Sequence, residues 1–173
     1  MHLQREGQHI DRESAIADAR RALTEVYRYL HHRCGSQALA EDHTSASLLA
    51  AVDRLLAGEI DRISVAYVVG IARHKLVDHW RRLERDRRQL ERHTASETGV
   101  HSDVVFEPGR SSAALRSISP MQRAALTLRY LDDLTVPQVA AELGRSVEAT
   151  ETLLMRAKRA FRDAYERLET DDV

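Results

Sequence analysis

The chain has 173 residues, which is enough for one medium-sized domain or two small ones. Hydrophobic residues make up 43% and charged residues 31%, as in a soluble folded protein, while 7 Gly and 3 Pro leave little material for the turns of a many-stranded sheet. The composition therefore predicts an all-α protein. Its one cysteine, Cys34, excludes a disulfide framework and favours a reducing compartment.

The charges nearly cancel, because 26 Lys and Arg face 27 Asp and Glu, and a net charge of −1 is unusual for a protein that holds duplex DNA unaided. The longest apolar run is far below the roughly 20 residues that cross a bilayer. The segment 1–11 is polar and lacks the apolar core of a signal peptide. We therefore expect a cytoplasmic protein with no membrane insertion.

Apolar residues at helical spacing predict three helices in the first half, at about residues 14–33, 37–57 and from 64 into the charged stretch 81–92. The third helix carries Trp80 on its apolar stripe. The periodicity then disappears over residues 93–111, where three acidic side chains and no basic one lie between Arg92 and Arg110. We interpret 1–92 as one small helical bundle and 93–111 as a flexible acidic linker.

The second bundle, 112–173, has clear helix boundaries in its sequence. Ser119–Gln122 and Thr135–Gln138 both have the form of a capping box, with a hydroxyl at the N-cap and Gln three residues later. Gly144 is typical of a tight turn that ends one helix, and Ser146 is a suitable N-cap for the next. The last helix, 147–168, is expected to bury these side chains: Val147, Thr150, Leu154, Ala157 and Phe161.

Residues 135–162 have the pattern of a helix-turn-helix, in which a short capped helix, a glycine turn and a longer helix follow one another. The face of the longer helix opposite its buried stripe carries these residues: Arg145, Glu148, Ala149, Glu151, Thr152, Arg156 and Arg159. Small polar groups near its start suit base edges, and arginines further along suit phosphates. A purely structural helical hairpin is the alternative.

The outward face of the third helix is strongly basic. It carries Tyr67, His74, Asp78, Arg81, Arg85 and Arg88. One interpretation is an ordinary solvated face. The other is a basic track for a nucleic-acid strand, with Tyr67 available to stack on an unpaired base.

Four stretches, taken in order, resemble the extracytoplasmic-function sigma factors of the sigma-70 family, which keep two of the conserved sigma regions. They are Ala40-Glu41-Asp42 with Leu48-Leu49, then residues 71–82, 115–123 and the helix-turn-helix ending at Arg162. The resemblance covers about residues 14–168. It implies two small helical bundles, a region-two domain at 1–92 and a region-four domain at 112–173, joined by the linker.

The resemblance also implies that the chain binds core RNA polymerase at the β′ clamp helices and the β flap, and that the region-two domain docks on the clamp helices. The helix that begins at Ala40 would make the first contact, through Glu41, Asp42, Ser45, Leu48, Leu49 and Asp53. Ser45 and Ala46 stand where the family usually has a Gln-Glu pair. An anti-sigma factor or other regulatory protein is a further expected partner.

By the same resemblance, the third helix and the preceding loop, 59–64, would melt and read the promoter element nearest the start site. Positive charge for the strand would come from Arg62, His74, Lys75, Arg81, Arg82 and Arg85. The region-four domain would read the upstream element in the major groove. Glu151, where the family often has a basic residue, suits a cytosine amino group better than a phosphate.

The sequence therefore predicts a sigma factor that directs promoter-specific initiation, with no catalytic activity, metal or cofactor of its own. Residues 1–92 carry 16 basic and 14 acidic side chains and residues 112–173 carry 9 and 10, so neither half is basic enough to hold DNA tightly alone. The polymerase would supply most of that affinity. The alternative is a stand-alone helix-turn-helix regulator whose N-terminal half binds a ligand or protein.

Overall fold

The structure is a computed structural model that describes residues 12–93 and 109–171, and every regular element in these two ranges is helical. The elements are α1 (Arg12–Cys34), α2 (Gln37–Leu56), α3 (Val65–His93), α4 (Arg110–Ser117), α5 (Pro120–Leu126), the π-helical turn η1 (Thr127–Leu131), α6 (Val136–Leu143) and α7 (Val147–Asp171). The predicted all-α class is confirmed. Over the same ranges, no helix combines the length and the apolar character that crossing a bilayer requires.

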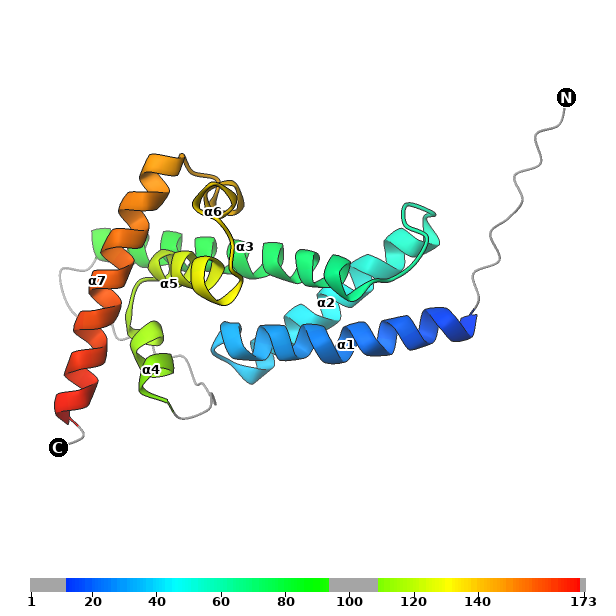
Figure 1. The fold of residues 1–173 in the computed structure, drawn as a ribbon, viewed down its shortest axis with the longest axis horizontal. Helices are drawn as coiled ribbons and strands as arrows, with labels where there is room; N and C mark the ends of the chain where they lie inside the picture. Colours follow the sequence, from blue (N-terminus) through cyan, green and yellow to red (C-terminus); the bar gives the residue numbers. More distant parts are fainter. Residues whose placement is uncertain (1–11, 94–108, 172–173) are drawn as a thin grey trace, which may run out of the picture.

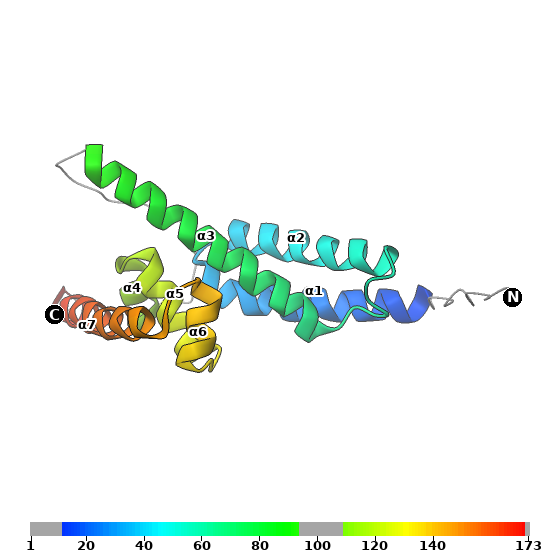
Figure 2. The ribbon, with the colours of Figure 1, turned by 90° about the horizontal axis from the view of Figure 1, so that it is seen from above.

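Helices α1, α2 and α3 form a three-helix bundle (Figures 1 and 2). Val26 and Leu30 of α1, Leu76 of α3 and the predicted core residue Trp80 are at most 1% exposed. Ser36 caps α2 by accepting a hydrogen bond from the backbone N–H of Leu39 at 3.4 Å. The buried apolar side chains hold α3 against α1 and α2.

In the second half, α4 and α5 pack on α7, and α6 lies across the start of α7 (Figure 1). The predicted capping box of α5 is present. The backbone N–H of Gln122 donates to Ser119 Oγ at 3.3 Å, and the backbone N–H of Ser119 donates to Gln122 Oε1 at 3.1 Å. The Thr135 N–H likewise donates to Gln138 Oε1 at 2.8 Å at the start of α6. Both predicted helix starts are confirmed.

Two details differ from the sequence-based expectation. Val147 was expected to be buried but is 38% exposed, because it is the first residue of α7 and lies to one side of the position where Thr150 is buried, and Phe161 is only partly buried. The helices also extend into both ends of the expected linker, since α3 runs through His93 and α4 begins at Arg110. The remainder of the linker lies outside the described residues.

Helix α3 joins the two halves. It is 29 residues long and extends beyond the ends of α1 and α2, and α5 and α6 of the second half pack against it (Figures 1 and 2). The two halves are therefore in direct contact through side chains as well as through the chain itself. The sequence did not predict this contact.

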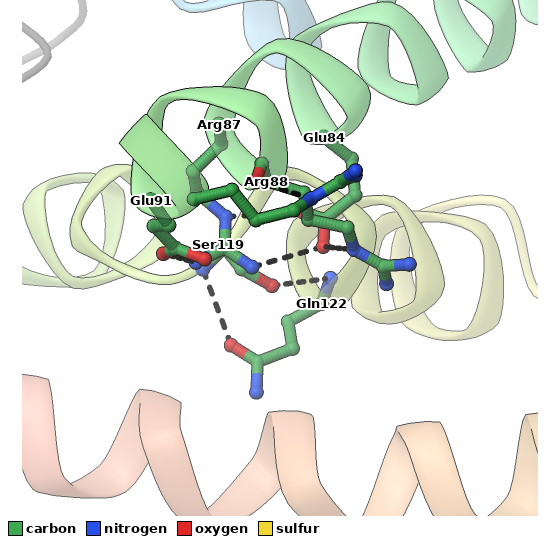
Figure 3. Close-up of polar contacts among 7 residues, drawn as sticks. Glu84, Arg87, Arg88, Glu91, Ser119 and Gln122 are labelled. Atoms are coloured by element: carbon green, nitrogen blue, oxygen red, sulfur yellow. Dashed lines mark hydrogen bonds and ion pairs between the residues drawn. The ribbon is translucent and has the colours of Figure 1, made fainter. Parts of the chain in front are cut away.

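Glu84 lies on the part of α3 that extends beyond the first bundle, and its side chain is only 8% exposed. Its carboxylate accepts hydrogen bonds from Arg87 Nη2 at 2.9 Å and Arg88 Nε at 3.0 Å, and Arg87 also pairs with Glu91 (Figure 3). Burial acts to raise the pKa of Glu84, but these hydrogen bonds and charges outweigh it and lower the pKa. The buried carboxylate is thus kept ionised and paired.

His43 of α2 and His79 of α3 lie edge to face, with ring centroids 5.6 Å apart. Burial lowers the pKa of His79 to about 4, and the charges of Arg82 and Arg123 act in the same direction. Burial, followed by the charges of Lys75 and Arg82, also lowers the pKa of His43. Both rings are therefore neutral at pH 7, packed between α2 and α3.

This histidine pair predicts a loss of stability in mild acid. An unfolded histidine gains a proton as the pH falls through about 6.5, whereas folded His79 stays neutral until about pH 4. The unfolded state then binds more protons, so the free energy of unfolding should fall as the pH drops from about 6.5 to 4. Urea denaturation across this range measures the effect.

The substitution His79→Gln should flatten this pH dependence, because the variant lacks the ring whose protonation favours unfolding. The matched control is His32→Gln, at an exposed position of α1. If the His79→Gln variant lost stability with falling pH as steeply as the native chain, the pH dependence would not come from His79.

Candidate functional site

The helix-turn-helix expected from the sequence is present as α6, a turn at Gly144, and α7. Gly144 has φ +59°, and the turn closes with hydrogen bonds from the Gly144 N–H to Ala141 O at 3.2 Å and from the Arg145 N–H to Ala140 O at 2.9 Å. Ser146 Oγ accepts from the Ala149 N–H at 3.2 Å and caps α7. The left-handed φ at position 144 is why glycine is needed there.

The outward face of α7 is open. The predicted DNA-contacting residues Arg145, Glu148, Ala149, Glu151, Thr152, Arg156 and Arg159 are all exposed. Thr150, on the opposite face, is fully buried and donates to Ser146 O at 2.9 Å. Hydrogen bonds from its own backbone and from Ser146 lower the pKa of Glu148. The first turn of α7 therefore presents a negative charge, and the following turns present arginines.

Helix α2 buries one stripe and exposes another. The buried stripe consists of Ala40, Thr44, Ser47, Ala51 and Leu55. The predicted polymerase-binding residues lie on the opposite side, where Glu41, Asp42, Ser45, Leu49 and Asp53 are exposed and Leu48 is partly buried. Leu49 and Leu56 are 62% and 75% exposed, so this side of α2 carries apolar as well as acidic side chains.

The predicted strand-binding residues of α3 and its preceding loop differ in exposure. Arg62, His74, Arg82 and Arg85 are exposed, whereas Tyr67, Lys75 and Arg81 are partly buried. The Tyr67 hydroxyl accepts a hydrogen bond from Arg54 Nη1 at 2.9 Å, so α2 helps to orient this ring. The residues do not form one uniform basic track, because some of them contact the second half of the chain.

Asp132 is central to that contact, and the sequence analysis missed it. The π-helical turn η1 places it, through a hydrogen bond from the Asp132 N–H to Thr127 O at 3.1 Å. Asp133 follows with a positive φ of 53°, and the Leu134 N–H donates a hydrogen bond to Leu128 O at 3.1 Å. This sharp end to the helix directs the Asp132 side chain into the first half, where it is 2% exposed.

The partners of Asp132 come from α1 and α3. Tyr29 Oη donates to Asp132 Oδ2 at 2.8 Å, and Arg33 Nε donates to Asp132 Oδ1 at 2.9 Å. Arg73 Nε lies 3.4 Å from Asp132 Oδ2. Burial, with the adjacent Asp132 charge, raises the pKa of Tyr29, so its hydroxyl remains a donor. The carboxylate is buried and supported by charged and neutral donors.

Glu142, near the end of α6, makes a second set of contacts with α3. Its carboxylate lies 3.5 Å from Arg73 Nη1 and 3.2 Å from His74 Nδ1. Arg81 Nη2 donates to the Glu142 carbonyl at 2.7 Å. The structure therefore brings two predicted DNA-contacting residues, His74 and Arg81, against the helix-turn-helix.

Only spatial packing reveals these contacts, because Tyr29 and Asp132 are separated by 103 residues. The π-helical turn gave no periodicity signal, and the pair Asp132-Asp133 after a Leu resembles ordinary turn residues. Within residues 12–93 and 109–171, no three His, Cys, Asp or Glu side chains are grouped in a way that could hold a metal ion.

Comparison with known proteins links these features to a family. Residues 112–161 match the family described as Sigma-70, region 4. The chain is 34% identical over 146 residues to the ECF RNA polymerase sigma factor BldN of Streptomyces coelicolor, covering 79% of this chain and 54% of that protein. The chain thus spans about half the length of this relative.

A solved structure also shares the fold. The sigma factor RpoE from Bartonella quintana, in its complex with the anti-sigma factor NepR, aligns with a TM-score of 0.54 and 16% identity. The alignment covers 87% of this chain and 96% of RpoE, so the shared fold extends over both halves. Residues 112–161 thus match sigma-70 region 4, and the chain as a whole is similar to an extracytoplasmic-function sigma factor of the sigma-70 family.

Proposed function

We propose that this chain binds core RNA polymerase and directs promoter-specific initiation of transcription. In this proposal residues 1–92 bind the polymerase and open the promoter. Residues 93–111 link the two domains, and residues 112–173 read the upstream promoter element. The observation that carries it is that a region-four helix-turn-helix accompanies a separate bundle whose α2 exposes leucines beside acidic residues. One chain thus offers both a DNA-reading surface and a protein-binding surface.

We assign the exposed face of α2 to the polymerase β′ clamp helices. Leu49 supplies apolar area, and Glu41, Asp42 and Asp53 surround it with negative charge. An apolar centre with a charged rim is typical of a specific protein interface. Ser45 lies on the same face and replaces a larger polar side chain, so the contact there is smaller.

We assign the β flap to an apolar groove on the second half. Its volume is about 660 Å³, and its lining includes Leu126, Tyr130, Leu131, Phe161 and Tyr165. The groove lies between α7 and the segment formed by α4, the end of α5 and η1, away from the exposed DNA-reading face at the start of α7. Since RpoE was solved with an anti-sigma factor, we also propose that a regulatory protein binds this chain and blocks its polymerase contacts.

We assign promoter recognition to both halves. In the second half, the first turn of α7 would meet base edges, with Glu151 and Thr152 reading bases and Arg156 and Arg159 meeting phosphates. In the first half, Arg62, Lys75, Arg82 and Arg85 are spread along α3 and its preceding loop and would meet the phosphates of the strand, and Tyr67 would stack on a base. The polymerase brings both elements of the promoter to the chain.

Transcription from a library of genome fragments, with core polymerase and the purified chain, tests the proposal. A sigma factor should give defined transcripts only when both components are present, and the enriched fragments should reveal its promoter sequence. Sequence-specific protection of duplex DNA by the chain alone, with no effect on the polymerase, would instead indicate a stand-alone regulator.

Leu49→Ala should weaken binding of the chain to core polymerase by about tenfold, as expected when an anchor at the centre of an interface is truncated. Titration of a fluorescently labelled chain with core polymerase measures the dissociation constant. Leu23→Ala is the matched control, because Leu23 is an exposed leucine on α1, 44% accessible. Equal affinities for the two variants would remove Leu49 from the interface.

Arg156→Ala should weaken promoter binding by the polymerase complex and reduce the salt dependence of that binding by about one phosphate contact. Mutating a phosphate contact should affect all promoter sequences alike, whereas Thr152→Val should alter the preferred bases. Affinity measured over a salt series distinguishes the two effects. Arg20→Ala, at an exposed position of α1, is the control. If promoter affinity fell equally steeply with salt concentration in the Arg156→Ala and Arg20→Ala variants, the phosphate role of Arg156 would be contradicted.

A further inference from the structure

We propose that Arg123 is a positioning residue for the apolar groove of the second half. It ties the end of α4 to α5 and so keeps Leu115, which forms the α4 wall of the groove, in place. Arg123 itself does not line the groove. This inference rests on the proposed function, because it gives a role in polymerase binding to a residue behind the site assigned to the β flap.

Arg123 lies on α5 and donates hydrogen bonds to the main chain of α4. Its Nε donates to Leu115 O at 2.9 Å, and its Nη2 donates to Arg116 O at 2.7 Å. Both carbonyls belong to the last turn of α4, where helix carbonyls lack partners within the helix and form the negative end of its dipole. A guanidinium suits this end, because it is cationic and carries several donors in one plane.

Helix α4 depends on such external support. It has only eight residues, and isolated helices this short are unstable in water. Its N-cap, Gly109, makes no side-chain hydrogen bond. At the other end, Ser117 Oγ donates to Ala114 O at 2.9 Å, so Ser117 and Arg123 together satisfy the consecutive carbonyls of residues 114–116. The last turn of α4 is therefore held largely by side chains that follow it in the sequence.

The two ends of α4 are held with different strength. At its start, Arg110 Nη1 lies 3.2 Å from Glu169 Oε1 of α7, but these side chains are 36% and 61% exposed, and exposed pairs contribute little. At its end, Arg123 is partly buried. Burial, followed by the charge of Arg116, lowers the pKa of Arg123 to about 10, so its guanidinium remains charged at pH 7. The end that carries Leu115 is thus the more firmly held.

The same bonds connect two walls of the groove. Leu115 is the α4 residue in the lining, and Leu126, at the end of α5, is the α5 residue. Without the Arg123 donors, the carbonyls of Leu115 and Arg116 would turn to water, and the last turn of α4 would fray. A partner would then have to order α4 as it binds, which lowers its affinity by the fraction of molecules already ordered.

Arg123→Met tests the inference, because it removes the donors and keeps most of the side-chain length. The labelled chain is titrated with core polymerase and with core polymerase that lacks the β flap tip. The variant should bind the complete polymerase about tenfold more weakly than the native chain does, and the truncated polymerase equally well. Amide hydrogen exchange should become faster in residues 110–117 and stay unchanged in 147–156. Arg123→Lys, which keeps the charge and one donor group, should restore part of the lost affinity.

The matched control is Arg167→Met. Arg167 is exposed, and its Nε donates to Asp163 O of the same helix at 3.1 Å, so its bond joins no two elements. This variant should leave both affinities and the exchange of α4 unchanged.

The inference is overturned if Arg123→Met weakens binding to both polymerases equally, or if its α4 amides exchange at the native rate. Should Arg123→Met fail to fold, Arg123→Lys decides, since its loss of affinity must be confined to the complete polymerase. Equal binding of the native chain to the two polymerases would remove the β flap from the proposed function. The exchange of α4 would then still decide whether Arg123 positions this wall of the groove.

Discussion

The arrangement of this protein depends on a negative charge buried between its halves. Asp132 is almost inaccessible to solvent, yet it is supported by Tyr29, Arg33 and Arg73, three side chains from α1 and α3. A carboxylate buried in this way is tolerated only when donors surround it. The contact between halves is therefore specific in orientation, and it turns the helix-turn-helix toward the basic face of α3.

Helix α3 has two roles that compete. It packs against α1 and α2 in the first bundle and against α5 and α6 of the second half, and its C-terminal part carries the paired Glu84. The same helix presents arginines and lysine that suit a nucleic-acid strand. Because both halves pack against this one helix, a shift of α3 in one half would also move its contacts in the other half.

Local features of the fold were predictable from the sequence, and contacts between distant segments were not. The capping boxes at Ser119 and Thr135 and the turn at Gly144 each depend on residues that are neighbours in the sequence. Such short signals can be recognised without knowing the fold. Periodicity also located Trp80 in the core and the exposed face of α7. Asp132 gave no such signal, because its burial depends on a π-helical turn and on partners about a hundred residues away. Val147 was misplaced because periodicity assigns a face of the helix but does not say how deeply its first residue is buried.

The most direct measurement is a cryo-electron microscopy structure of this chain bound to core polymerase on an opened promoter. The account predicts that α2 lies against the polymerase, that α7 lies in the major groove of the upstream element and that α3 lies along the opened strand. A complex in which α2 makes no contact with the polymerase, or in which α3 and α7 are both remote from the DNA, would contradict it.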